Sequence, residues 1–124
     1  MTVLRLIGYW RSASRPDLPD PVDFVDPTWD EKERLEAVVY LRSGIVTRAY
    51  LGFSPCRMCD NRGNGSLELT DGTYVWPEGL AHYVEQHGVK LPGEFLEHAR
   101  HVSETYGRAR IDETWWLAHG PTRR

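Results

Sequence analysis

The sequence has few of the features that mark a specialised protein class. It holds only two cysteines among 124 residues, which excludes a scaffold stapled by several disulfides. No apolar stretch approaches the roughly 20 residues that span a bilayer. The first ten residues do not form a signal peptide, because Arg5 and Gly8 interrupt their apolar run. We therefore expect a cytoplasmic protein without a membrane segment.

Neither sign of charge dominates the chain. It carries 18 acidic and 15 Lys or Arg residues, interspersed along its length, and no segment forms the basic stripe that follows a phosphate backbone. Duplex nucleic acid is therefore an unlikely partner on charge grounds. The hydrophobic content of 40% suits a globular core, and there is no internal repeat or linker. We expect a single domain over residues 1–124.

The hydrophobic pattern predicts an α+β fold, with a small antiparallel sheet and three helices. Strands are expected at residues 3–10 and 45–53, where apolar or β-branched residues gather. A hairpin is expected over residues 67–76, because Asp71-Gly72 favours a tight type I′ turn between two short strands.

Helices are expected from Thr28 or Asp30 to Gly44, over residues 77–87 and over residues 92–106. Thr28 with Glu31, and Asp30 with Glu33, each have the spacing of a capping box at the start of the first helix. Its buried stripe is predicted to be Leu35, Val38 and Val39. Pro77 and Pro92 suit the first turns of the other two helices, and Gly88 suits the end of the second. After the third helix, we expect Trp115-Trp116-Leu117 to dock the C-terminus onto the body.

Residues 11–27 are predicted to form an extended arm rich in proline and aspartate. The prolines are Pro16, Pro19, Pro21 and Pro27, and the aspartates are Asp17, Asp20, Asp23 and Asp26. A spacing of three residues places the four carboxylates on one edge of a polyproline II helix. Such an edge could face a cation or a basic partner, but we expect it to be a solvated edge.

The most informative residues are two pairs with the spacing of metal ligands. Cys56 and Cys59 form C-x2-C, and His82 and His87 form H-x4-H after a 22-residue spacer. Thiolates and imidazoles are the ligands that Zn²⁺ prefers, and a tight turn lets two cysteines reach one ion. The sequence therefore predicts a structural Cys2His2 zinc site, with a spacer longer than that of a classical zinc finger.

The expected order around these residues is strand, cysteine knuckle, hairpin and helix. In this order, residues 53–88 resemble the zinc-ribbon and treble-clef kind of metal site, in which a knuckle meets a helix across a hairpin. The resemblance rests on four residues, and it implies an architecture rather than an activity.

Helical geometry leaves alternatives for the histidine ligands. On a regular helix, His82 and His87 lie about 140° apart, so both reach one ion only if the last turn tightens or unwinds. If the helix stays regular, His98, His101, Asp60 or a water could replace one of them, and a water ligand would make a catalytic site conceivable. A metal-free redox pair and two inert cysteines are further readings, although a redox C-x2-C normally opens a helix, whereas a loop follows here.

Two functions follow from these readings. The first is a module that binds a protein or peptide through Tyr74 and Trp76, with zinc as a structural ion, because aromatic side chains are common anchors of binding surfaces. The second is a small zinc-dependent hydrolase with an open metal position. Glu78, one helical turn before His82, would be its general base. Four protein ligands would favour the first function, and three ligands with an accessible water would favour the second.

Overall fold

A computed structural model describes residues 1–121 and gives an α+β fold around a four-stranded sheet. The strands are β1 (Arg5–Leu6), β2 (Ile45–Ala49), β3 (Leu67–Thr70) and β4 (Tyr74–Pro77), in the order β1-β4-β3-β2. The pairs β2–β3 and β3–β4 are antiparallel, but β1 runs parallel to β4. The sheet is therefore mixed, and the expectation of an antiparallel sheet was wrong for its first strand.

The first strand is also shorter than predicted. Pairing with β4 stops after Ile7, whose N–H donates to the carbonyl of Val75. Gly8 then adopts a positive φ of 78°, and a Cβ there would lie 2.5 Å from a methyl carbon of Leu80. A glycine is needed because the backbone both turns and passes directly over a core side chain.

The expected helices are present, and there is one more at the C-terminus. They are α1 (Glu31–Arg42), α2 (Leu80–His87), α3 (Gly93–Gly107) and α4 (Thr114–Ala118), and the 3₁₀ helix η1 (Pro21–Phe24) precedes α1. Asp30 caps α1 by accepting a hydrogen bond from the N–H of Glu33, as its spacing predicts. Gly88 ends α2 in the left-handed conformation. Pro77 belongs to β4 instead of opening α2.

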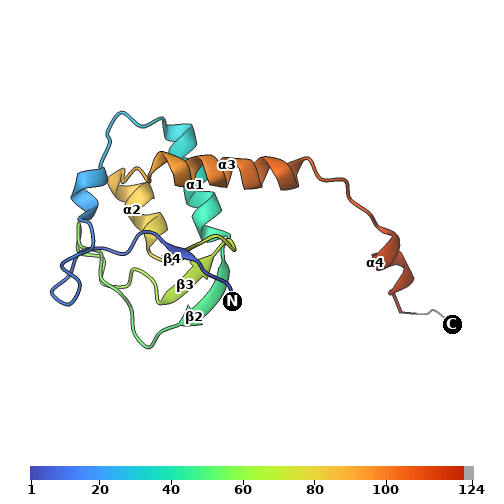
Figure 1. Ribbon diagram of the computed structural model, residues 1–124, viewed down its shortest axis with the longest axis horizontal. Helices are drawn as coiled ribbons and strands as arrows, with labels where there is room; N and C mark the ends of the chain where they lie inside the picture. Colours follow the sequence, from blue (N-terminus) through green and yellow to red (C-terminus); the bar gives the residue numbers. More distant parts are fainter. Residues whose placement is uncertain (122–124) are drawn as a thin grey trace.

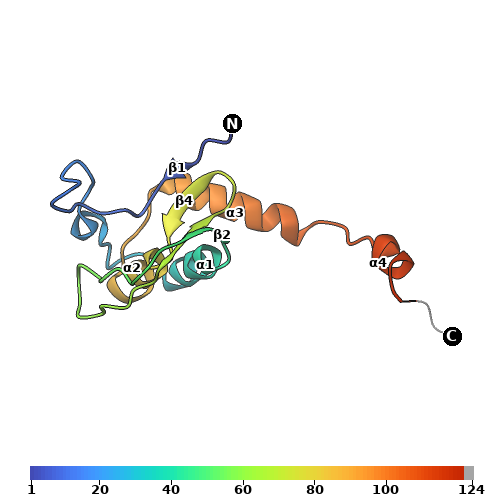
Figure 2. The same ribbon diagram turned by 90° about the horizontal axis from the view of Figure 1, so that it is seen from below.

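The core lies between the sheet and helices α1, α2 and the first turns of α3 (Figures 1 and 2). Trp76 of β4 is completely buried at its centre, where its indole N–H donates to the carbonyl of Leu41. The buried stripe of α1 is Ala37, Val38 and Leu41. Leu35 and Val39 are exposed instead, because the helix turns toward α2 the face that contains Val38.

The β3–β4 hairpin is present, but its turn is longer than a two-residue type I′ turn. The register pairs Thr70 with Val75 and leaves residues 71–74 to close the loop. The carboxylate of Asp71 accepts hydrogen bonds from the N–H groups of Thr73 and Tyr74 and from the hydroxyl of Tyr40. One side chain thus joins the turn to α1.

The segment 11–27 is less extended than predicted, because it contains a loop followed by η1. Three of its aspartates have local partners. Asp17 pairs with Arg15, Asp20 caps η1, and Asp26 accepts from Thr28. These contacts fix the path of the chain and give no support to a carboxylate stripe that binds a cation.

The C-terminal helix α4 projects away from the body, beyond the end of α3 (Figures 1 and 2). Trp115, Trp116 and Leu117 are 66%, 70% and 75% exposed. The prediction that these residues dock the C-terminus was therefore wrong. Residues 108–113 carry the chain past the end of α3, and Trp115 and Trp116 stack on each other instead of entering the core.

Candidate metal centre

The two cysteines lie in a tight loop over residues 54–65, here called the knuckle loop. Hydrogen bonds between Ser54 and both Asn64 and Gly65 close its base. Inside the loop, the N–H of Cys56 donates to the carbonyl of Asn61, and the N–H of Met58 points at the sulfur of Cys56. This turn brings Cys59 back beside Cys56, as the C-x2-C spacing predicts.

The knuckle loop is fastened to the start of α2 by a buried amide. The side-chain N–H of Asn64 donates to the carbonyl of Gly79 over 3.2 Å. A Cβ at position 79 would lie only 2.2 Å from the carbonyl oxygen of Asn64, so the two backbones are in direct contact. Because Gly79 is followed immediately by α2, this contact sets the position of the cysteines relative to the helix.

Tyr83 of α2 joins the knuckle loop to the core. Its ring is buried in the core, and its hydroxyl oxygen accepts a 2.8 Å hydrogen bond from the N–H of Arg57, between the two cysteines. Burial raises the pKa of Tyr83 to about 12, so the hydroxyl stays neutral at physiological pH. This hydrogen bond therefore fixes the position of the knuckle-loop backbone relative to α2.

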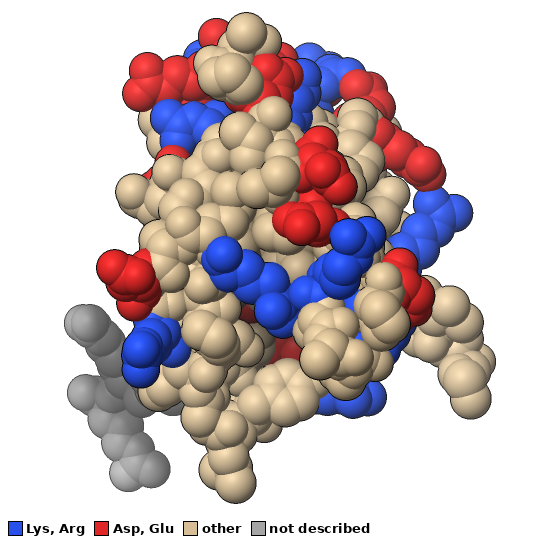
Figure 3. All heavy atoms as spheres, turned by 90° about the vertical axis from the view of Figure 1, so that its left-hand side faces the viewer, with Lys and Arg blue, Asp and Glu red and all other residues tan. Residues whose placement is uncertain are grey.

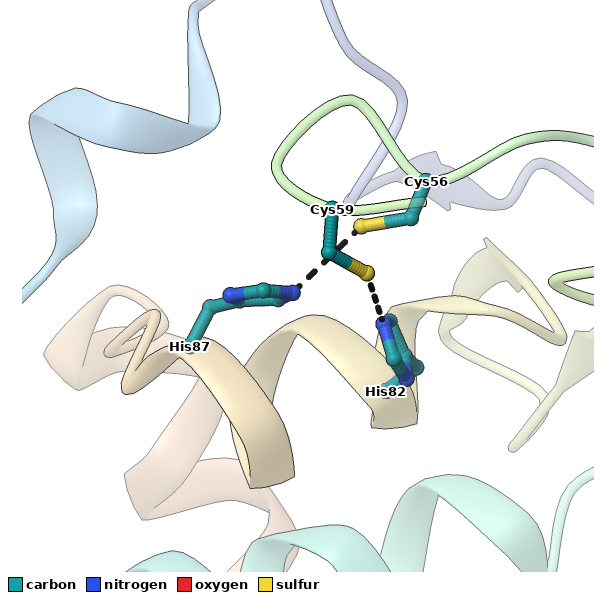
Figure 4. Close-up of side chains that lie close together, drawn as sticks. All are labelled: Cys56, Cys59, His82 and His87. Atoms are coloured by element: carbon teal, nitrogen blue, oxygen red, sulfur yellow. Dashed lines mark hydrogen bonds between the residues drawn. The ribbon is translucent and has the colours of Figure 1, made fainter. Parts of the chain in front are cut away.

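Cys56, Cys59, His82 and His87 converge on one point (Figure 4). The sulfur of Cys56 lies 3.5 Å from Nε2 of His87, and the sulfur of Cys59 lies 3.3 Å from Nε2 of His82. One ligand atom from each residue lies within 4.8 Å of all the others. A tetrahedral zinc ion with ordinary bond lengths would separate a sulfur from a nitrogen by about 3.5 Å. The four residues therefore fit one metal ion.

Both histidines reach the site without unwinding the helix. α2 stays helical through His87, and the imidazole rings of His82 and His87 have centroids 5.1 Å apart. Figure 4 shows one ring approaching from each end of the helix, with the knuckle across the middle. The expected need for a distorted last turn was therefore wrong. The two side chains lean inward from opposite flanks, and each meets a different cysteine.

The surroundings favour the protonation state that binds a metal. Burial lowers the pKa of His82, and the nearby His87 lowers it further, so the neutral imidazole is favoured. Cys56 is buried, Cys59 is exposed and both histidines are half-buried. The site is thus closed on its protein side and open to solvent at Cys59.

The substitute ligands considered from the sequence do not join this cluster. Nε2 of His98 lies 3.2 Å from the carboxylate of Asp71, on α3 and away from the knuckle. Asp60 and His101 are exposed. Among residues 1–121, the group formed by Cys56, Cys59 and the two α2 histidines is the one that brings together three or more such side chains.

Two further residues singled out from the sequence are occupied elsewhere. The carboxylate of Glu78 accepts hydrogen bonds from the N–H groups of Ser66 and Leu67, so it braces the strand that follows the knuckle loop. Tyr74 and Trp76 are buried in the core, where both rings pack edge-on against Phe95. They are therefore not available as surface anchors for a partner.

The residues that position the site were missed by sequence reasoning. Asn64 and Gly79 lie in segments that look like ordinary turns, and their contact joins residues 15 positions apart. From the sequence alone, Tyr83 is an aromatic residue of the helix predicted over residues 77–87, and nothing in that pattern indicates its hydrogen bond to the knuckle loop. The one available signal was the position of Tyr83 between the two histidines on the same helix.

Comparisons with known proteins provide no family for this arrangement: no protein-family model, curated protein or solved structure matches the chain. The local order of knuckle, hairpin and helix is present, but a zinc-ribbon fold is not established. Over the described residues, none of the helices has the length and apolar character needed to cross a bilayer.

Proposed function

We propose that the protein binds one zinc ion at a structural Cys2His2 site and works as a small binding module for a protein or peptide. The zinc site is supported by the convergence of four ligand atoms within 4.8 Å of one another. Two thiolates and two imidazoles form a soft, tetrahedral set, which suits zinc better than the oxygen-preferring ions.

A structural role for the ion agrees with the number of ligands. Catalytic zinc sites keep a position for water beside three protein ligands, whereas four protein ligands close the sphere. The general base proposed for a hydrolase, Glu78, is held by two backbone N–H groups of the β3 segment. No specific contact favours the hydrolase, so the binding module is the better-supported function.

In this proposal, zinc stiffens a surface made by the knuckle loop and the N-terminal loop. A cavity of about 350 Å³ lies between them, and its lining includes the aromatic residues Tyr9, Trp10 and Tyr83. Its charged residues are Arg15, Arg57 and Glu68, and Arg15 pairs with Asp17, so we assign the binding role to Arg57. On this side of the molecule, Lys and Arg side chains form a band across the middle of the face (Figure 3). Aromatic walls beside guanidinium groups suit a peptide with an acidic side chain.

Metal analysis of purified protein tests the first half of the proposal. We expect about one zinc per chain, and a cobalt-substituted form should show the absorption of a tetrahedral site with two sulfur ligands. A folded protein that carries no metal and gains none from added Zn²⁺ would refute the zinc site. A five- or six-coordinate cobalt spectrum would instead point to an open metal position.

A peptide array tests the binding role. Acidic, neutral and basic peptides of matched length would be probed with the zinc-loaded protein and with Arg57→Glu. We expect acidic peptides to bind the native protein and to lose at least about tenfold in affinity with Arg57→Glu. Arg108→Glu, the same exchange at the exposed residue that follows α3, is the matched control. Equal binding by all three proteins would contradict a role for this cavity.

A further inference from the structure

Among the exposed apolar surfaces of residues 1–121, two involve helices outside the metal centre. The first is a groove of about 830 Å³ on α1, closed on one side by Ser103 of α3. Leu35 and Val39 form its apolar floor, and they are 41% and 66% exposed. Glu31 and Lys32 lie at its rim.

The second surface is the C-terminal arm, here defined as residues 108–118. It contains Ile111, Trp115, Trp116 and Leu117, each at least 66% exposed. The indole rings of Trp115 and Trp116 stack with centroids 6.4 Å apart, and the imidazole of His119 stacks on Trp115. Tryptophans are the side chains that most often dominate the energy of an interface, and two of them rarely stay in water together.

We propose that the C-terminal arm of one copy docks into the α1–α3 groove of a second copy, and that the exchange is reciprocal. The chain carries both an apolar groove and an apolar arm, and neither is covered by residues 1–121 of the same copy. A reciprocal exchange covers both surfaces twice and closes as a two-fold dimer, the commonest form of assembly. The proposal is independent of the metal centre.

The conformation of the arm favours a second copy over closure within one chain. α3 ends at Gly107 and α4 begins at Thr114, so residues 108–113 form the connection. In both ribbon views this connection continues outward from α3 and holds α4 away from its own body (Figures 1 and 2). In a dimer that exchanges a segment, the segment extends away from its own body and reaches the other copy.

Charge and area are both compatible with this contact. The groove lining carries Glu31, Lys32 and Glu36, and Lys32 pairs with Glu36. This leaves Glu31 as the charge that Arg110 of the arm would meet. A buried tryptophan removes roughly 150–250 Å² from water, so the four tryptophans of two arms contribute on the order of 600–1,000 Å². The two grooves contribute a smaller area than the arms do. The sum lies near the roughly 1,000 Å² that marks the lower end of specific interfaces.

The test is the solution mass of the full-length, metal-loaded chain, measured by light scattering and by sedimentation at tens of micromolar. We expect the native chain to be a dimer. The arm variant Trp115→Ser/Trp116→Ser and the groove variant Val39→Asp should each be monomeric. Leu51→Asp places the same charge at a fully exposed apolar residue outside both surfaces, and it should remain dimeric. Far-UV circular dichroism checks that every variant is folded.

Mixing the two monomeric variants sharpens the test. The arm variant keeps an intact groove and the groove variant keeps an intact arm, so an equimolar mixture should form heterodimers through one contact. Those heterodimers should be weaker than the native dimer by at least about 100-fold. A dimer that survives both variants would overturn the proposal and place the interface elsewhere. A monomeric native chain would also overturn it, and a red shift of its tryptophan emission on Val39→Asp would then show that the arm closes on its own groove.

Discussion

The two ends of this molecule are built in opposite ways. At the metal end, short polar contacts converge: Asn64 holds the knuckle loop to α2, Tyr83 supports it, and four ligand atoms share one centre. At the other end, α3 extends beyond the body and is followed by α4, whose large apolar side chains are exposed and lie outside the core (Figure 1). The comparison shows that polar contacts within one chain organise the metal end, whereas the apolar side chains of the arm stay exposed in a single copy.

Removal of a metal ligand should break the organised end and has the largest expected effect. In Cys56→Ser, we expect loss of bound zinc and a loss of stability on the order of 3–5 kcal/mol, less than the roughly 10 kcal/mol found in small zinc peptides, because this chain also has a core. Metal content and Tm measure the two effects. Chelation of the native protein should reproduce them, and an unchanged Tm in both cases would contradict a structural ion.

The two histidines should prove equally important. Because His82 and His87 each lie within about 3.5 Å of a different cysteine sulfur, we expect His82→Ala and His87→Ala to lower zinc affinity by similar factors, at least about 100-fold. Competition with a chromophoric chelator measures these affinities. His98→Ala and His101→Ala are matched controls that should retain zinc. Loss in only one α2 variant would indicate a three-ligand site.

The buried amide offers a milder way to loosen the same end. Asn64→Ala removes the hydrogen bond to the carbonyl of Gly79 and leaves that acceptor without its partner. We expect a loss of about 1–3 kcal/mol in the free energy of unfolding, with weaker zinc binding as a consequence. Denaturant unfolding with and without zinc separates the two contributions. Asn61→Ala, an exchange in the same loop, is the comparison variant.

Acid titration tests the hairpin turn, which lies between the two ends. Burial alone would raise the pKa of Asp71, but hydrogen bonds from Tyr40 and from two backbone N–H groups outweigh it and lower the pKa. A carboxylate with a lowered pKa stabilises the fold above its unfolded pKa of about 3.9, and that stability is lost as the pH falls through the folded value. In Asp71→Asn, we expect about 1–2 kcal/mol less stability at neutral pH and a flatter decline below pH 4. A decline as steep as the native one would show that other groups are responsible.

The arm should contribute almost nothing to the stability of a single copy. In Trp115→Ser/Trp116→Ser, measured at a concentration low enough for monomers, we expect a change of less than about 0.5 kcal/mol in the free energy of unfolding. Trp76→Ala, by contrast, should cost about 3–5 kcal/mol, because its ring is fully buried. A large effect of the arm substitutions at that concentration would mean that the arm packs on its own body.

The sequence predicted the metal end better than the rest, for physical reasons. C-x2-C and the two α2 histidines are local patterns whose geometry is imposed by a tight turn and by one helix. The caps at Asp30 and Gly88 are local for the same reason. The parallel pairing of β1 with β4 joins residues that are about 70 positions apart, and no local pattern determines it.

Errors in the predicted core have a common origin. Val39 and Val38 are adjacent on α1, and only the position of α2 decides which of them is buried. Trp76 and Trp115 are chemically identical, yet one fills the core and the other lies in solvent. Amino-acid type gives the tendency to be buried, but the tertiary arrangement decides which side chains find a partner.

The two cysteines of the metal centre differ in their exposure, so an oxidant would reach one sulfur before the other. Cys59 is exposed and Cys56 is buried, so an oxidant from solvent would meet the sulfur of Cys59 first. The thiolate of Cys56 would then attack the sulfur of the sulfenic acid formed at Cys59, with hydroxide leaving, and the resulting disulfide would remove two ligands from the proposed ion. Mass spectrometry after graded peroxide treatment would show whether the proposed zinc ion departs as the disulfide forms. The ion that we propose to stiffen the loop would thereby also make the loop sensitive to a mild oxidant.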